Sequence, residues 1–227
     1  MTIQCLTFDL DDTLWDVHPV IIRAEKRFYE WLATHYPHIS QEFDLNAMVA
    51  HRQTYFTQFE DMRHDFTWLR KKWLAHLATE YQCPKEFETV GFEVFHKARN
   101  EVEFYDGVID MMEEVAPNYT IISITNGNAD VNKVGLGKYF DFAVTAAEVG
   151  AAKPDPRIFQ KALELGKVQP ENVIHIGDDP VRDVNGAAVL GMKTIWVNTH
   201  RQPWPGGDRA NSEVIHISQL SEAIKSL

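Results

Sequence analysis

The second half of the chain alternates between short β-branched runs and segments with helical periodicity, and this pattern restricts the fold more than any other feature. The runs 119–125, 140–146, 172–177 and 193–198 are predicted strands, and 128–137, 155–166 and 180–191 are predicted helices. A last strand and helix are predicted within 213–227. Such alternation favours right-handed βαβ units. We therefore expect an α/β, Rossmann-like core with a parallel sheet and helices on both faces, which also contains the first apolar run, 3–8.

Residues 17–104 break this alternation. The segment is rich in helix-forming and aromatic residues, and apolar side chains recur at helical spacing in 19–36 and 66–81. The sequence therefore predicts a core made of residues 1–16 and 105–227, with an all-helical insertion, 17–104, after the first strand.

Charge and composition limit the classes of partner. The chain has 227 residues and a formal net charge of −11, with no block of basic residues. Nucleic acids and anionic membranes are therefore not expected as partners. No apolar run approaches the roughly 18 residues of a membrane span. The two cysteines, Cys5 and Cys83, lack metal-binding spacing, so we expect free thiols and a cytoplasmic location.

Three carboxylates follow the first predicted strand, at Asp9, Asp11 and Asp12. Their mutual repulsion is unfavourable unless a cation or a proton compensates it. An EF-hand loop starting at Asp9 would need glycine at its sixth position and glutamate at its twelfth, where this chain has Leu14 and Val20. The strand tip is therefore a candidate site for another kind of cation.

Polar residues also follow the strand 119–125. The pair Asn126-Gly127 alone is typical of a hairpin turn. The following segment has a helical pattern, however, so Thr125 and Asn126 are predicted to form an anion-binding corner at a helix N-terminus.

Two further loops carry charged candidates. Lys153 precedes Pro154, and although a single loop lysine is usually only solvated, the proline stiffens its backbone. After the strand 172–177, Asp179 has the position of a helix N-cap and Asp183 can complement the helix dipole. Asp178 has no such structural explanation, which makes it a candidate metal ligand.

Ligands of open parallel sheets bind beyond the carboxyl ends of the strands. There the sequence places three carboxylates, a hydroxyl and a lysine: Asp9, Asp11, Asp178, Thr125 and Lys153. Mg²⁺ prefers hard oxygen ligands and removes the repulsion among carboxylates. The set indicates metal-assisted phosphoryl transfer to or from a small-molecule phosphate ester.

The motifs "DLDDT", "ITNG", "KPDP" and "GDDPVRD", in this order, resemble the four motifs of the haloacid dehalogenase (HAD) superfamily of phosphohydrolases. The insertion resembles the C1-type cap of that family. The resemblance implies that Asp9 is the nucleophile, that Asp11 is the general acid and base, and that Thr125, Asn126 and Lys153 hold the phosphoryl group. It further implies that Mg²⁺ is bound by Asp9, by the Asp11 carbonyl and by Asp178, with Asp183 in support.

Other activities within and outside the family have to be weighed. Dehalogenases of the superfamily lack the second aspartate of the first motif, which is Asp11 here, so a phosphatase is favoured. Phosphomutases keep both aspartates and are not separated by this motif. A broad-range sugar-phosphate or nucleotide phosphatase and a catalytically silent binding protein are the alternatives, and the oligomeric state is left open.

Longer stretches resemble bacterial HAD phosphatases that act on FMN and on 5-amino-6-(5-phosphoribitylamino)uracil. They include "LTFDLDDTLWD", "RHDFTWLR" and "ITNGNADVNKVGLGKYFDF". Trp15, Phe66 and Trp68 are candidates to stack on a planar ring, with His64 or Arg70 at its polar edge. The alternative for Phe66 and Trp68 is that they form the core of the helical insertion.

Overall fold

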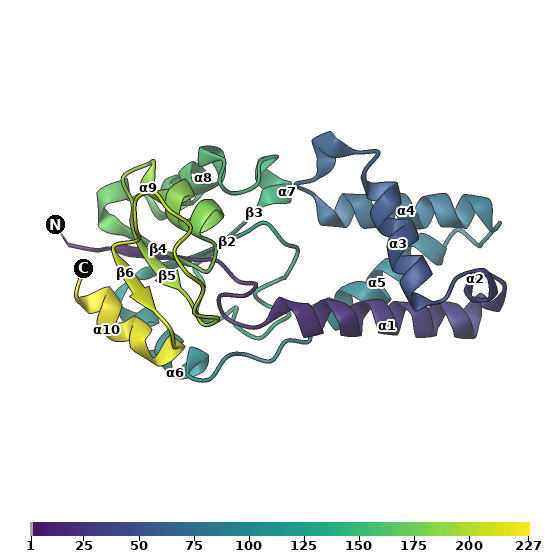
Figure 1. Ribbon diagram of the computed structural model, residues 1–227, viewed down its shortest axis with the longest axis horizontal. Coiled ribbons are helices and arrows are strands. Elements are labelled where there is room, and N and C mark those ends of the chain that lie inside the picture. The colour runs from purple at the N-terminus through teal and green to yellow at the C-terminus, as the bar shows by residue number, and fades with distance from the viewer. Residues whose placement is uncertain (1) are drawn as a thin grey trace. The chain divides into compact units, whose positions relative to one another are not determined.

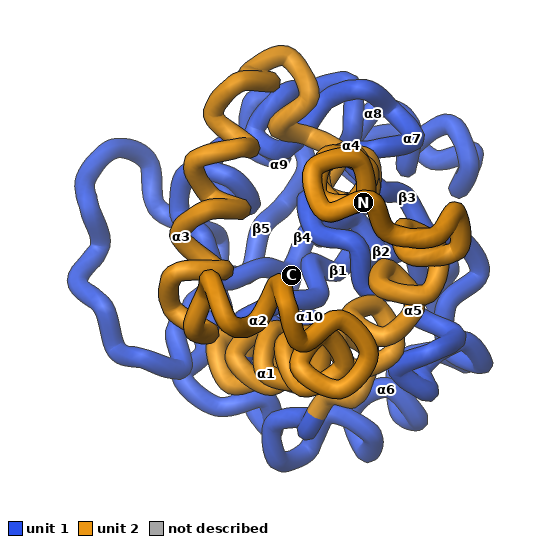
Figure 2. Tube along the Cα trace, turned by 90° about the vertical axis from the view of Figure 1, so that its right-hand side faces the viewer, with its two compact units in different colours: residues 1–16, 103–227 blue, residues 17–102 orange. Residues whose placement is uncertain are grey.

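The computed structural model describes residues 2–227, which form two compact units (Figure 2). One unit, the core unit, consists of Met1–Asp16 and Glu103–Leu227. The other, the helical unit, is Val17–Val102. The chain therefore leaves the core unit after its first strand and returns to it about 90 residues later.

The core unit is built on a six-stranded sheet in which every pairing is parallel. Its strands are β1 (Cys5–Phe8), β2 (Thr120–Thr125), β3 (Phe142–Thr145), β4 (Val173–Gly177), β5 (Lys193–Val197) and β6 (Ser212–Val214). The strand order is β3-β2-β1-β4-β5-β6, the order of Rossmann-type sheets. The predicted α/β fold class is confirmed.

Helices lie on both sides of this sheet (Figure 1). They are α6 (Val108–Val115), α7 (Ala146–Val149), α8 (Pro156–Gly166), α9 (Gly186–Ala188) and α10 (Leu220–Lys225). Figure 1 shows α6 and α10 on one side and α8 and α9 on the other. Phe159 of α8 packs with Ile122 of β2 and Val144 of β3 in a buried cluster, because the apolar residues of α8 recur on one helix face.

Two predicted helices differ from the structure. Residues 128–137 form no helix, and 131–135 are a turn, because the Asn132 N–H donates to Asp130 Oδ1 at 2.9 Å and Gly135 has a left-handed φ of +92°. The predicted anion corner at a helix N-terminus is therefore absent after Asn126. Residues 180–191 contain a π-helical turn, Pro180–Asn185, followed by the short α9.

The helical unit contains α1 (Val17–His35), α2 (Pro37–Glu42), α3 (Leu45–Phe56), α4 (Phe66–Glu80) and α5 (Phe87–Arg99), with a 3₁₀ turn at Glu60–Met62. Its core brings together Phe28 and Leu32 of α1, Trp73 and Leu77 of α4, and Phe87 of α5. The residues of α1 and α4 belong to the apolar stripes of the sequence, so burial of one face of each of these helices explains the packing.

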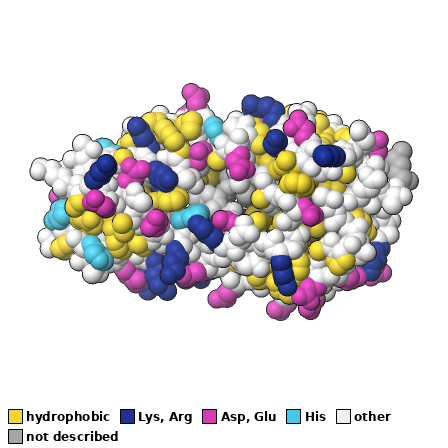
Figure 3. Space-filling model, turned by 180° about the vertical axis from the view of Figure 1, so that it is seen from behind, with side chains coloured by type: hydrophobic (Ala, Val, Ile, Leu, Met, Phe, Trp, Pro, Cys, Tyr) yellow, Lys and Arg dark blue, Asp and Glu magenta, His cyan; other side chains and the backbone are white. Residues whose placement is uncertain are grey.

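Acidic and basic side chains are interspersed on the face of the molecule shown in Figure 3. Among the described residues, no helix combines the length and the apolar character that a bilayer span requires.

Candidate active site

The site forms at the carboxyl edge of the sheet, where β2, β1 and β4 are neighbours. Thr125 ends β2, Asp9 follows β1, and Asp178 follows β4. Parallel strands end at the same edge, so residues far apart in the sequence come together there. The Asp9 N–H continues the pairing of β1 with β4 by donating to the Ile176 carbonyl at 2.9 Å.

Lys153 joins two of the carboxylates. Its Nζ lies 2.5 Å from Asp9 Oδ1 and 2.6 Å from Asp183 Oδ1, and its side chain is buried. Burial alone would lower the pKa of Lys153, but Asp183 and Asp9 raise it above its ordinary value. Burial raises the pKa of Asp9 to about 7, although Lys153 opposes the shift. The lysine therefore favours the charged form of a buried carboxylate.

The backbone of Lys153 is held by Asn126. Asn126 Oδ1 accepts the Lys153 N–H at 2.7 Å, and Asn126 Nδ2 donates to the Lys153 carbonyl at 3.0 Å. The Thr125 hydroxyl oxygen accepts the Gly127 N–H at 2.9 Å, a bond that does not use the hydroxyl proton. Asn126 therefore positions the lysine, while Thr125 retains a proton to donate at the strand end.

The Asp183 carboxylate is hydrogen-bonded to His175, a buried residue of β4. His175 Nε2 lies 3.1 Å from Asp183 Oδ1, and His175 Nδ1 lies 2.8 Å from Thr7 Oγ1. Burial lowers the pKa of His175, so the neutral ring donates to Asp183 and accepts from Thr7. Burial alone would raise the pKa of Asp183, but Lys153 and His175 bring it well below the ordinary range.

The carboxylates of Asp178 and Asp9 both contact the hydroxyl group of Thr13. The Thr13 Oγ1 lies 3.2 Å from both Asp9 Oδ2 and Asp178 Oδ1. Burial and the neighbouring Asp9 raise the pKa of Asp178 to about 9. Three carboxylates, those of Asp9, Asp178 and Asp183, place oxygens within 4.8 Å of one another. Lys153 compensates only part of this negative charge, and a cluster of hard oxygens that carries excess negative charge fits the needs of a Mg²⁺ ion.

Asp179 has the role that its sequence position indicates. Its side chain accepts the Val181 and Arg182 N–H groups at 2.8 Å each and thereby caps the turn that begins at Pro180. The prediction of an N-cap at Asp179 is confirmed.

Trp15, predicted to stack on a substrate, is instead fully buried in the core unit. Its indole ring packs against Phe104, with 6.0 Å between ring centroids. The Trp15 Nε1 donates to Asp11 Oδ1 at 2.9 Å. A ring without exposed surface has no face to offer a ligand, so the structure replaces the stacking contact with a hydrogen bond to a site residue.

The other substrate candidates lie in the helical unit. Arg70 is buried, ion-paired to Glu25 and stacked over the Phe95 ring at 3.2 Å from its centroid. His64 is half-buried in the turn before α4. Trp68 is half-buried with its ring edge-on to Phe59, and Phe66 is 47% exposed. Arg70 therefore belongs to the core of this unit, whereas Phe66 and His64 present surface.

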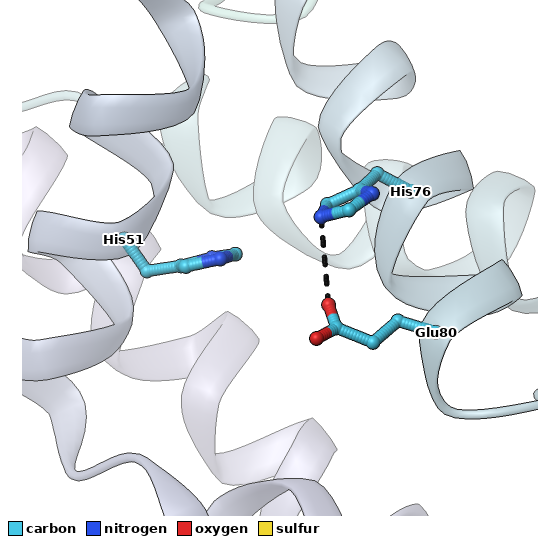
Figure 4. A group of neighbouring side chains, drawn as sticks. All are labelled: His51, His76 and Glu80. Atoms are coloured by element: carbon cyan, nitrogen blue, oxygen red, sulfur yellow. Dashed lines mark ion pairs between the residues drawn. The ribbon is translucent and has the colours of Figure 1, made fainter.

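The helical unit also holds a group of possible ligands outside the sheet edge, His51, His76 and Glu80 (Figure 4). His76 Nε2 lies 3.4 Å from Glu80 Oε2. His51 Nδ1 accepts the indole N–H of Trp73 at 3.1 Å. Because an indole only donates, the neutral His51 ring carries its proton on Nε2 and offers no lone pair there. This group is therefore better described as hydrogen-bonded packing than as a metal centre.

Sequence reasoning did not single out Thr7, Thr13 or His175. The histidine had a visible signal, because it is a polar residue inside the apolar run "VIHIG" and buried polar groups require partners. The threonines are less visible in the sequence, because Thr7 contacts a distant strand and Thr13 joins Asp9, four positions away, to the distant Asp178.

A buried lysine between two aspartates, beside further carboxylates at the edge of a Rossmann-like sheet, defines a hydrolase-type site. A family model described as haloacid dehalogenase-like hydrolase matches residues 3–191. The chain therefore belongs to the haloacid dehalogenase-like hydrolase family, as the four motifs predict.

Three relatives illustrate the range of this similarity. The chain is 29% identical to the 5-amino-6-(5-phospho-D-ribitylamino)uracil phosphatase YigB of Escherichia coli, over 98% of this chain and 96% of that one. It is 28% identical to a glyceraldehyde 3-phosphate phosphatase of Pyrococcus furiosus, over 86% of this chain and 80% of that one. The crystal structure of a protein named 2-haloacid dehalogenase, from Pseudomonas syringae pv. Tomato DC3000, has 34% identity and a TM-score of 0.91, with 99% of each chain covered.

Proposed function

We propose that this hydrolase is a Mg²⁺-dependent phosphatase that cleaves a small phosphate monoester through an aspartyl-phosphate intermediate. The contact between Lys153 Nζ and Asp9 Oδ1 carries the proposal. A carboxylate can attack phosphorus only in its charged form, and burial alone would protonate Asp9. The lysine opposes that protonation and supplies positive charge where the ester phosphate would bind.

The residues of the chain account for both half-reactions. In the first, an Asp9 oxygen bonds to phosphorus while the ester P–O bond breaks, and Asp11 donates a proton to the departing oxygen. In the second, Asp11 takes a proton from the water whose oxygen attacks phosphorus, which releases Asp9 and inorganic phosphate. Lys153 and the Thr125 hydroxyl stabilise the charge on the phosphoryl oxygens throughout.

The metal would be held by the Asp9 and Asp178 side chains and the Asp11 backbone carbonyl, with Asp183 in support. When bound, Mg²⁺ neutralises the carboxylates and the phosphoryl oxygens. The raised pKa of Asp178 supports this assignment, because burial beside Asp9 leaves its negative charge without a close cation.

Dehalogenation is the second candidate, favoured by the similarity to the Pseudomonas syringae protein that is named a 2-haloacid dehalogenase. A halide leaves as a stable anion and needs no proton, whereas an alkoxide is a poor leaving group without one. This chain has a second carboxylate, Asp11, and a buried indole that holds it. An acid at this place serves ester cleavage, so we favour the phosphatase.

The substrate that we propose is a ribityl phosphate of the flavin type, either 5-amino-6-(5-phosphoribitylamino)uracil or FMN. The full-length similarity to the Escherichia coli phosphatase supports this choice. The similarity to a glyceraldehyde 3-phosphate phosphatase keeps a broad sugar-phosphate or nucleotide phosphatase as the alternative. In either case the helical unit would act as a substrate-selecting cap.

We also propose a cytoplasmic location. Cys5 and Cys83 are free thiols, as the sequence predicts, and free thiols are usual in a reducing compartment.

Phosphate release from flavin, sugar and nucleotide monophosphates, with halide release from 2-chloropropionate in parallel, tests the proposal. We expect Mg²⁺-dependent phosphate release, abolished by EDTA, with kcat/KM highest for the flavin-type ester. Asp9→Asn should retain the fold and lower turnover to below about one-thousandth. Halide release without phosphate release would identify a dehalogenase, and full activity of Asp9→Asn would exclude the aspartyl-phosphate.

A further inference from the structure

Trp15 holds the carboxylate of Asp11 through the only hydrogen bond that an indole can make. The indole carries one donor and no acceptor, and here Nε1 donates to Asp11 Oδ1 at 2.9 Å. The ring is fully buried, whereas the Asp11 carboxylate is half-buried. If the bond were broken, the buried indole N–H would be left without an acceptor, which is unfavourable in free energy. The bond therefore constrains the carboxylate more than a surface contact would.

The backbone around Trp15 is anchored on both sides. The Asp12 N–H donates to the Trp15 carbonyl at 2.7 Å, and Asp12 has a left-handed φ of 61°. The Leu14 carbonyl accepts the Tyr105 N–H at 2.9 Å. Trp15 also forms an antiparallel bridge with Phe104, whose ring packs on the indole. The donor therefore lies at a fixed place relative to the end of β1.

The bond also distinguishes the two oxygens of Asp11. An indole N–H cannot accept, so Oδ1 serves as an acceptor in both protonation states of the carboxyl group. When Asp11 is the acid, the bond favours the carbonyl form of Oδ1, the better acceptor, and therefore the proton on Oδ2. A single oriented oxygen that carries the proton is what a general acid needs, because proton transfer requires alignment as well as a suitable acid.

We propose that Trp15 is a positioning residue that orients Asp11 so that Oδ2 delivers the proton to the leaving oxygen. The inference rests on the proposed function, and it assigns to Trp15 a role in cleavage of the ester bond rather than in substrate recognition. In this step phosphorus bonds to Asp9, the ester oxygen takes the electron pair of the broken P–O bond, and the Oδ2 proton neutralises it.

Leaving-group dependence tests this role directly. An alkyl phosphate needs the proton, whereas 4-nitrophenyl phosphate has a leaving group stable as an anion, and kcat/KM reports on the first irreversible step. For Trp15→Phe we expect kcat/KM to fall about 10- to 100-fold on the alkyl ester and to change less than about threefold on the nitrophenyl ester. For Asp11→Asn we expect kcat/KM to fall further on the alkyl ester than it does for Trp15→Phe, and again to fall much less on the nitrophenyl ester.

Two further variants separate positioning from packing. Phe104→Leu removes the ring that packs on Trp15 but leaves the indole N–H, so it should lower stability without changing the ratio of the two kcat/KM values. Replacement of Trp15 by 3-benzothienylalanine keeps the shape of the ring and removes only the N–H, so it should reproduce the selectivity of Trp15→Phe in a folded protein.

The outcomes of these assays are distinguishable. Equal losses on both esters with the benzothienyl residue, or no loss on either, would overturn the role of Trp15 while leaving a working phosphatase. A wild-type protein that releases phosphate from neither ester would overturn the proposed function and this inference with it.

Discussion

Lys153 Nζ lies 2.5 Å from Asp9 Oδ1, although 144 positions separate the two residues in the chain. The same ammonium contacts Asp183 at 2.6 Å, so one cation is shared by two buried carboxylates. The arrangement couples stability to chemistry, because the charge that favours an ionised Asp9 also compensates the burial of Asp183.

Lys153→Met is expected to damage both properties. It leaves two buried carboxylates without their cation, so the free energy of unfolding should fall by about 3–5 kcal/mol. Loss of the positive charge should lower kcat by roughly 100- to 1,000-fold. Urea denaturation and phosphate release measure the two effects. Lys161→Met is the matched control, because Lys161 is exposed in α8 and its removal should change stability by less than about 0.5 kcal/mol. Equal behaviour of the two variants would contradict a structural role for Lys153.

Gly177→Ala should displace Asp183. A Cβ at Gly177 would lie 2.3 Å from Asp183 Cγ, closer than atoms can approach. The Asp183 side chain must therefore move away from Lys153 and His175, and we expect a loss of about 1–3 kcal/mol in stability together with weaker Mg²⁺ binding. Gly166→Ala is the control, since its Cβ would meet only side-chain atoms at 3.2 Å or more. Calorimetric titration with Mg²⁺ that shows wild-type affinity for Gly177→Ala would refute this expectation.

Stability of the metal-free protein should fall as pH rises from about 7 to about 9. The pKa of Asp178 is raised to about 9 in the folded protein, compared with ~3.9 in an unfolded chain, so the folded state binds more protons in this window. The derivative of unfolding free energy with pH is then negative. Asp183, with its lowered pKa, and Lys153, with its raised pKa, keep their charges throughout the window.

Thermal melts with and without Mg²⁺ at several pH values test this expectation. The stabilisation by Mg²⁺ should increase with pH, because the ion binds the deprotonated carboxylates. Asp178→Asn should flatten the pH dependence and reduce the response to Mg²⁺. A metal-free protein whose melting temperature rises between pH 7 and pH 9 would contradict the assignment.

The site was predictable where chemistry follows the ends of parallel strands. Asp9, Thr125 and Asp178 are adjacent because β2, β1 and β4 are neighbours, and the alternating pattern that predicts such a sheet is local in the sequence. The contact of Asp9 with Lys153 depends in addition on the loop after α7, in which Asn126 holds the Lys153 backbone. Sequence periodicity therefore predicts which strand ends lie together at the site.

The parts that were not predictable depend on side-chain direction and local competition. The sequence shows that Trp15 is aromatic and near the carboxylates, but not that its ring is turned into the core with the N–H on Asp11. The helix expected at 128–137 was wrong because Asp130 bonds to the backbone of Asn132 instead of leaving it to helical pairing.

Glu25 and Arg70 give a last prediction, in the core of the helical unit. Glu25 Oε1 is shared by Arg70 and by Arg52, the latter at 3.1 Å. Glu25→Leu leaves two cations without their carboxylate, whereas Arg70→Met leaves Glu25 paired with Arg52. We therefore expect Glu25→Leu to cost about 3–5 kcal/mol and Arg70→Met clearly less.

Urea denaturation followed by circular dichroism measures both losses, with Lys26→Met as an exposed control on α1. The Arg70→Met variant also tests whether Arg70 has a role in substrate binding. If Arg70 only supports the core, kcat/KM for a flavin-type ester and for 4-nitrophenyl phosphate should change by the same factor in Arg70→Met. A selective loss on the flavin-type ester would instead assign Arg70 to recognition, because only a contact with the substrate's ring or ribityl chain distinguishes the two esters.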